Sequence, residues 1–219
     1  MDAASIGCGS VYRCVMPTHP LWHPYAVPTD AEIAAARVLP APAERVEVVA
    51  PDPGWAAAFE RVREQIGAAL GARALAITHV GSTSVPGLAA KPVIDVDLIV
   101  ADARDEAAYL PALESAGFVL RIREPEWHEH RLVRGAEPVA NVHIWSPDCP
   151  EPARHRMFRD WLRADDDDRR AYGELKLALA HQGFEDVMHY NNAKSALIYD
   201  IYERAFAADP AHPHDPQPR

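Results

Sequence analysis

The most restrictive feature of the chain is a pair of aspartates within an apolar run, PVIDVDLIV, at residues 92–100. The run has the length and composition of a buried strand, and side chains alternate between the two faces of a strand. Asp95 and Asp97 therefore lie on one face, and Val96 and Leu98 lie on the other. Two carboxylates in apolar surroundings are costly unless a cation neutralises them, which favours a divalent metal site. The alternative is that the strand ends near Asp95 and that water solvates both carboxylates.

A glycine-serine turn precedes this strand in the segment THVGSTSVPG, residues 78–87. Twelve residues separate Ser82 from Asp95. Backbone N–H groups at such a turn, together with a serine hydroxyl, can hold a phosphate, and a metal can bridge that phosphate to carboxylates on the next strand. Gly81 and Ser82 are therefore predicted to bind phosphate beside a metal held by the aspartates.

The turn matches neither of two better-known motifs. Pro86 stands where a P-loop requires its second glycine, and the segment is not the GxSxG elbow of serine hydrolases. We therefore interpret Ser82 and Ser84 as phosphate ligands and not as nucleophiles.

The remaining pattern predicts one α+β domain at residues 29–207. The expected architecture is a short mixed β-sheet flanked by helices, with a C-terminal helical layer. Residues 1–28 are predicted to be a flexible leader, and the proline-rich residues 208–219 a disordered tail. Strands are expected at 45–50, 74–80, 92–100 and 118–122 and in a hairpin of 130–134 with 139–145; helices are expected at 29–39, 55–70, 107–118, 155–182 (broken near the acidic run 165–168) and 192–206.

Composition limits the partners. A formal net charge of -10 argues against a protein that binds duplex nucleic acid by neutralising its phosphates, although a local basic pocket could still hold a small anion. We find no apolar run of the roughly 18 residues that a membrane span needs and no signal-peptide pattern. A cytoplasmic location is therefore expected. The sequence does not indicate the oligomeric state.

Several segments together carry a family resemblance. HVGSTSVPGLAAKPVIDVDLIV resembles the core motif of the GrpB family, within the DNA polymerase beta-like nucleotidyltransferase superfamily. Further segments are similar to the family and occur along the chain in the family's order: VVAPDPGWAAAFE before this motif, and VHIW, FRDWLR, YGELKLALA and YNNAKSALI after it. GrpB domains also occur fused to dephospho-CoA kinase. The resemblance covers roughly residues 29–206 and implies a nucleotidyltransferase-like fold whose sheet carries the acidic pair.

One departure from the superfamily pattern concerns the third carboxylate that nucleotide-transferring members carry on a later strand. The matching strand here, ANVHIW, bears His143 instead, as GrpB proteins generally do. His143 could ligate a metal, act as the base for a nucleophile, or pack beside Trp145 against a backbone carbonyl. As a ligand it would favour Mn²⁺ or a transition metal over Mg²⁺. We take Asp95, Asp97 and His143 as the catalytic and metal-binding set.

Basic residues are expected to complete a polyphosphate site, because a polyphosphate needs cations besides the metal. Helical pairs occur at Arg159 with Arg163, Tyr172 with Lys176, and Tyr190 with Lys194. The predicted nucleotide- and phosphate-binding residues are Gly81, Ser82, Ser84, Lys91, Arg131, Arg159, Lys176 and Lys194.

These features predict a metal-dependent nucleotidyltransferase that uses Mg²⁺ or Mn²⁺, a nucleoside triphosphate such as ATP, and an unknown small-molecule acceptor. The nucleotidyl group would stay on the acceptor or activate a carboxylate for amide formation. The alternatives are a non-catalytic nucleotide-binding module that assists a partner enzyme and a metal-dependent phosphohydrolase.

Overall fold

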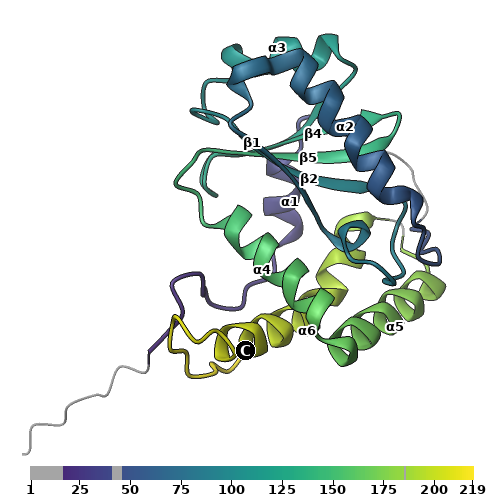
Figure 1. The fold of residues 1–219 in the computed structure, drawn as a ribbon, viewed down its shortest axis with the longest axis vertical. Helices are drawn as coiled ribbons and strands as arrows, with labels where there is room; N and C mark the ends of the chain where they lie inside the picture. The colour runs from purple at the N-terminus through teal and green to yellow at the C-terminus, as the bar shows by residue number, and fades with distance from the viewer. Residues whose placement is uncertain (1–16, 41–45, 185) are drawn as a thin grey trace, which may run out of the picture.

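The computed structural model describes residues 17–40, 46–184 and 186–219. Within these residues a mixed five-stranded sheet packs between helices, which confirms the α+β class and the short mixed sheet (Figure 1). The strands are β1 (Ala76–Val80), β2 (Ile94–Ile99), β3 (Val119–Glu124), β4 (His130–Ala136) and β5 (Val139–Trp145). The helices are α1 (Asp30–Ala36), α2 (Gly54–Leu70), α3 (Glu106–Ser115), α4 (Glu151–Ala164), α5 (Asp166–Gln182) and α6 (Val187–Ala207), with short 3-10 turns at Gly71–Arg73 and Ser82–Ser84.

The strand order is β1-β2-β5-β4-β3, and only the β2–β5 pair is parallel. The expected hairpin is present as β4 and β5. The register places Asp95 opposite Asn141 and Asp97 opposite His143. The acidic strand and the strand that bears His143, which are far apart in the sequence, are therefore neighbours in the sheet.

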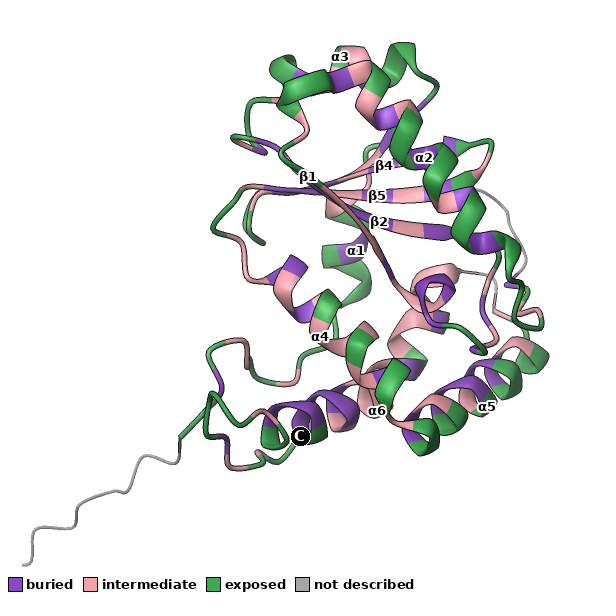
Figure 2. Ribbon diagram, in the orientation of Figure 1, coloured by how far each residue is buried: buried purple, intermediate pink, exposed green. Residues whose placement is uncertain are grey.

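The two faces of the sheet differ because its strands alternate. Val96, Leu98, Val142 and Ile144 are buried in the main apolar core, where α2 and α3 cover one face of the sheet (Figures 1 and 2). The side chains between them, including both aspartates, point to the opposite side, toward the layer of α4, α5 and α6. The predicted placement of the aspartates on a single face is confirmed.

The C-terminal helical layer packs on the loop after β1. Val85 and Leu88 of this loop are buried against Leu162, Tyr172 and Ile201, one from each of α4, α5 and α6. The expected break at the acidic run lies between α4 and α5, where the Asp165 side chain caps α5 by accepting from the Asp168 N–H. Asp168 is buried and accepts hydrogen bonds from Trp161 and Arg204.

Two expectations about local structure differ from the structure. Residues 46–50 do not form the predicted strand; Val49 makes only an isolated bridge to Ala90, and residue 45 lies outside the described part. A short segment without a paired neighbour along its length cannot satisfy its backbone groups as a strand.

The described part of the leader and the tail pack together on α6. Residues 208–219, expected to be a disordered tail, contact residues 17–28 there: the His19 N–H donates to His214 Nδ1 over 3.1 Å, and His214 is bonded to Glu203 at 2.9 Å. His19 also stacks on Phe206, with ring centroids 4.6 Å apart. Residues 1–16, most of the predicted leader, lie outside the described residues. Among the described residues, no helix combines the length and apolar character needed to cross a membrane.

Candidate functional site

A pocket of about 200 Å³ opens where the ends of β1 and β2 face α4 and α6. It contains members of both predicted halves of the site, the glycine turn and the acidic strand. Its lining residues are Val80, Gly81, Asp95, His143, His155, Phe158 and Tyr202.

Gly81 is required for this geometry on two grounds. Its φ of 66° lies in the left-handed region that favours glycine. A Cβ at this position would also lie 2.4 Å from Asp95 Oδ2. The absence of a side chain therefore lets the turn after β1 approach the carboxylate on β2 directly, which is the arrangement that the spacing of the two motifs predicts.

The two aspartates have different environments. Burial raises the pKa of Asp95, against the opposing effects of Lys91, a hydrogen bond from Asn141 and the charge of Lys194. For Asp97, burial alone would raise the pKa, but His155 and smaller contributions hold it below its usual value. Asp95 lines the pocket, whereas Asp97 is a buried anion with its own cationic partner.

That partner, His155 on α4, was missed by the sequence reasoning. Its Nδ1 lies 3.0 Å from both carboxylate oxygens of Asp97, and Trp145 Nε1–H donates to Asp97 Oδ1 at 2.9 Å. Burial would lower the pKa of His155, but Asp97 raises it. A signal was available, because His155 lies four residues before Arg159 and eight before Arg163, on the same helical stripe.

His143 is fixed by a second histidine. Its Nδ1 lies 3.0 Å from His130 Nε2, and His130 Nδ1 lies 2.6 Å from Glu124 Oε2. Burial, with the charges of His130 and His155, lowers the pKa of His143 to about 3, so this imidazole is neutral. The expected alternative of a bond to a backbone carbonyl is wrong. Neither His130 nor Glu124 was identified from the sequence.

The three lysines of the chain gather beside the acidic pair. Lys176 and Lys194 are buried, and each Nζ lies over the ring of the tyrosine four residues before it, at 4.5 Å from the Tyr172 centroid and 4.4 Å from the Tyr190 centroid. Lys91 Nζ lies 5.6 Å from the Tyr190 centroid. Lysines from three distant segments therefore lie near two neighbouring tyrosines, and their predicted role in binding phosphate stays a prediction.

Lys176 Nζ has no hydrogen-bond partner among the described residues. Burial and the charge of Lys194 lower the pKa of Lys176 to about 6, and burial and the charge of Lys91 lower that of Lys194 to about 7. Asp95 is the carboxylate that opposes both shifts. Buried amines whose positive charges would repel one another are suited to an anionic ligand, which would stabilise their protonated forms.

The fit of a metal is partial. The ligand atoms of Asp95, Asp97 and His143 do not all lie within 4.8 Å of one another, so these described residues form no ready three-ligand group. Both oxygens of Asp97 already accept hydrogen bonds. Asp95 alone is an open carboxylate, which suits Mg²⁺ or Mn²⁺ brought with a nucleotide, because such ions use one or two carboxylates plus substrate phosphates.

The remaining predicted ligands have more local roles. Ser84 is buried, and its hydroxyl donates to the Gly81 carbonyl, so it stabilises the turn itself. Ser82 follows Gly81 at the start of the 3-10 turn and is a hydrogen-bond neighbour of Tyr172. Arg159 donates to the His79 carbonyl of β1 and pairs with Asp160, so it fastens α4 to the sheet.

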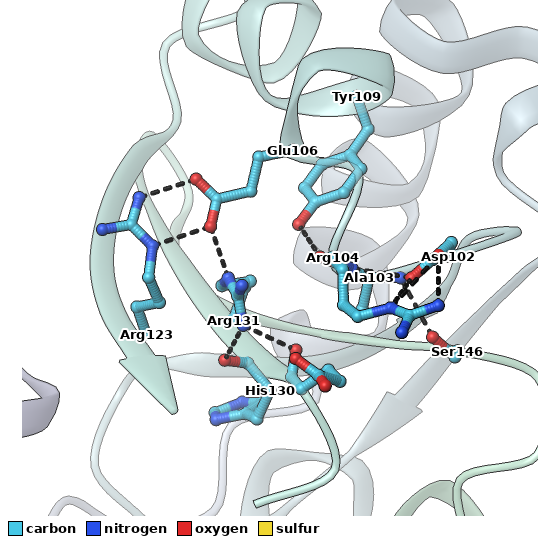
Figure 3. Close-up of polar contacts among 10 residues, drawn as sticks. Asp102, Ala103, Arg104, Glu106, Tyr109, Arg123, His130, Arg131 and Ser146 are labelled. Atoms are coloured by element: carbon cyan, nitrogen blue, oxygen red, sulfur yellow. Dashed lines mark hydrogen bonds and ion pairs between the residues drawn. The ribbon is translucent and has the colours of Figure 1, made fainter. Parts of the chain in front are cut away.

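Arg131 was predicted to bind phosphate, but its side chain lies on the face of the sheet opposite to the two aspartates. It alternates with His130 and Leu132 and shares the α3 side with Val133. Its Nε bonds Glu106 Oε1 at 2.5 Å, and Glu106 also pairs with Arg123 at 2.6 Å (Figure 3). The two arginines lower the pKa of Glu106 to about 2. Arg131 therefore ties α3 to the sheet and does not reach the pocket.

We expect Arg131→Met to destabilise the fold without changing nucleotide binding. The free energy of unfolding should fall by about 1–3 kcal/mol, because the variant breaks a buried pair while Glu106 keeps Arg123. Urea unfolding and calorimetric titration with ATP and Mg²⁺ measure the two quantities. The matched control is Arg104→Met, which removes an exposed pair with Asp102 and should leave the free energy of unfolding nearly unchanged. If Arg131→Met bound ATP more weakly than the wild type and Arg104→Met did not, Arg131 would have to contribute to the binding site.

A separate cluster joins His19, Asp209 and His212, whose ligand atoms all lie within 4.8 Å of one another. Its hydrogen bonds argue against a metal site. The Leu21 N–H donates to His19 Nδ1, so a neutral His19 carries its proton on Nε2 and presents an N–H to Asp209. The cluster therefore holds the leader to the tail by hydrogen bonds.

Comparisons with known proteins confirm the resemblance to the GrpB family. Residues 45–204 match the GrpB protein family. The chain belongs to the GrpB family. It is 47% identical to a UPF0157 protein of Halalkalibacterium halodurans over 156 residues, which are 71% of this chain and 80% of the relative. A UPF0157 protein of Streptomyces coelicolor is 46% identical over 157 residues, 72% of this chain and 82% of that protein.

A solved structure and a longer relative add to this. The crystal structure of the conserved protein GrpB from Enterococcus faecalis is similar with a TM-score of 0.63 and 32% identity, covering 73% of this chain and 97% of that one. A dephospho-CoA kinase of Mycolicibacterium paratuberculosis is 31% identical over 227 residues, covering 90% of this GrpB-family chain. The chain covers 54% of that kinase, so it corresponds to about half of the longer protein.

Proposed function

We propose that this GrpB-family protein is a metal-dependent nucleotidyltransferase that binds a nucleoside triphosphate such as ATP and transfers its nucleotidyl group to a small-molecule acceptor. The superfamily resemblance of the GS…DxD segment supports the reaction class. The partial similarity to a dephospho-CoA kinase supports a role involving nucleotides.

The observation that carries the proposal is the meeting of all three lysines with the glycine turn and Asp95. A triphosphate would favour the protonated forms of the buried Lys176 and Lys194 side chains and pair with them, and the backbone at Gly81 and Ser82 would hold one phosphate. Lys91 would contribute a third positive charge. Cations on several sides of one anion suit a polyphosphate better than a single carboxylate.

Asp95, and Asp97 once His155 withdraws, would hold Mg²⁺ or Mn²⁺, which when bound neutralises charge on the phosphates. The protein residues do the rest. Lys176 and Lys194 orient the phosphate chain, Gly81 keeps the turn close to Asp95, and Tyr202 and Phe158 exclude water from the pocket wall.

The second candidate is a nucleotide-binding module without turnover that assists a partner enzyme. One observation favours it: the hydrogen bonds of Asp97 to His155 and Trp145 leave only Asp95 open to a metal. A phosphohydrolase would use the same ligands with water as the nucleophile.

The proposal is tested by thermal unfolding with ATP, with and without Mg²⁺ or Mn²⁺, followed by product analysis. We expect ATP and metal together to stabilise the protein more than either alone. Asp95→Asn should remove the metal-dependent part and lower turnover by about 10²- to 10³-fold, because charge stabilisation at the phosphates is lost.

The exposed Asp102→Asn serves as the control and should behave as wild type. Stabilisation without pyrophosphate release would favour the binding module, and release of inorganic phosphate alone would favour the hydrolase. Wild-type binding and turnover by Asp95→Asn would show that the metal assignment is wrong.

A further inference from the structure

A line of hydrogen bonds leads from Glu124 through His130 to His143 and determines which nitrogen of His143 faces the pocket. A carboxylate only accepts hydrogen bonds, so His130 Nδ1–H donates to Glu124 over 2.6 Å. A neutral His130 then has its lone pair at Nε2 and accepts from His143 Nδ1–H over 3.0 Å. His143 Nε2, the nitrogen left toward the pocket, therefore carries a lone pair.

The rings in this line are held in place by packing. The His130 ring stacks on Trp145 with centroids 4.3 Å apart and meets the edge of Trp127 at 5.2 Å. His143 stacks on His130 at 5.2 Å with an interplanar angle of 20°. Burial lowers the pKa of His130 although Glu124 opposes the shift, which agrees with the neutral form that this direction of donation needs.

The lone pair of His143 and the carboxylate of Asp95 make this end of the pocket rich in hydrogen-bond acceptors. A hydroxyl or amine can donate to His143 Nε2, whereas the oxygens of a carboxylate would face a lone pair and lose a hydrogen bond. Lys176 on α5 and Lys194 on α6, where the phosphates would bind, lie over the rings of Tyr172 and Tyr190.

We propose that Glu124 and His130 are positioning residues that hold His143 Nε2 as a hydrogen-bond acceptor, and that the acceptor substrate reacts through a hydroxyl or an amine and not through a carboxylate. This rests on the proposed function. In the transfer, the acceptor oxygen or nitrogen forms a bond to the α-phosphorus, and the bond from that phosphorus to the bridging oxygen breaks. Pyrophosphate leaves with the electron pair, and the acceptor proton passes to His143 Nε2.

The tautomer is measured directly by long-range ¹H–¹⁵N correlation on the full chain labelled at histidine, with His143→Gln to assign the signals. We expect His143 to be protonated at Nδ1 and bare at Nε2. Glu124→Leu should populate the second tautomer of His143, whereas Glu124→Gln, whose amide oxygen still accepts from His130, should keep the first. A proton on Nε2 in the wild type, or an unchanged tautomer in Glu124→Leu, would overturn the positioning role.

The acceptor class is tested with ATP radiolabelled at the α-phosphorus, Mn²⁺ and two separate mixtures, one of small alcohols and amines and one of small carboxylic acids. We expect label in products from the first mixture, resistant to hydroxylamine, as phosphodiesters and phosphoramidates are. Glu124→Leu should lower kcat by about 10- to 100-fold with KM for ATP unchanged, and Glu124→Gln should restore much of it.

Label that hydroxylamine releases would come from an acyl phosphate and would overturn the hydroxyl or amine assignment while leaving the proposed function standing. Label in neither mixture would contradict the proposed function and with it the acceptor class. The tautomer is decided by the spectra in either case.

Discussion

Replacing Gly81 by alanine is expected to destabilise the protein by about 2–4 kcal/mol and to abolish binding of ATP with Mg²⁺. The φ of 66° is strained for alanine, and the new Cβ would lie 2.4 Å from Asp95 Oδ2 and 2.8 Å from Asp95 Cβ. The turn after β1 and the strand that bears Asp95 would have to separate. Urea unfolding and calorimetric titration measure the two effects.

Gly67→Ala is the matched control. Gly67 lies within α2, and a Cβ there meets nothing within 4 Å. Alanine is a better helix former than glycine, so this variant should gain about 0.5–1 kcal/mol and bind ATP as the wild type does. If Gly81→Ala were as stable as wild type and bound ATP normally, the close approach of the turn to Asp95 would have no role in the site.

Replacing Lys176 by methionine is expected to stabilise the free protein and to weaken ATP binding. The folded state lowers the pKa of Lys176 from 10.5 to about 6, so folding disfavours the ammonium. Below pH of about 6 the lysine is protonated in both states and its cost is fully present. Between about 6 and 10.5 the unfolded state binds the extra proton, so the stability of the wild type rises with pH, and above this window the cost is absent.

The stability gain of Lys176→Met should therefore be largest at acidic pH, on the order of a few kcal/mol, and should shrink as the pH rises through this window. Urea unfolding at pH values on both sides of neutrality measures the trend. Arg170→Met is the control, because Arg170 lies on the same helix with an exposed side chain and should change stability by less than about 1 kcal/mol. A gain that does not vary with pH would contradict a buried, shifted lysine.

The ligand should shift the balance of stability toward the wild type. At a hundredfold excess of ligand over Kd, binding adds about 2.7 kcal/mol to the wild type, and only about 0.4 kcal/mol if the variant binds a hundredfold more weakly. A charge-assisted hydrogen bond to phosphate is large enough to produce such a loss. Equal stabilisation of wild type and Lys176→Met by ATP and Mg²⁺ would remove Lys176 from the phosphate site.

Much of the architecture could be predicted from local patterns. Alternation in PVIDVDLIV placed Asp95 and Asp97 on one face, helical periodicity predicted α2, and the acidic run 165–168 indicated the break between α4 and α5. The strand predicted at 45–50 is not present in the described residues 46–50. Alternation of apolar and polar residues indicates a half-buried segment, but it does not show whether a neighbouring strand is present to pair with it. The order of the strands, which brings β5 beside β2, is also not written in any local pattern.

The sequence by itself determined the glycine turn, the acidic strand and the lysines that follow helical tyrosines, because each depends on spacing within one element. The tertiary structure alone decided which side chains share a face between elements. In the folded chain Arg131 pairs with Glu106, and Asp97 pairs with His155. His143 is linked to Glu124 through hydrogen bonds with His130. Such pairings depend on strand register and helix packing between segments far apart in the sequence, and burial then fixes the charges and tautomers of the groups that meet.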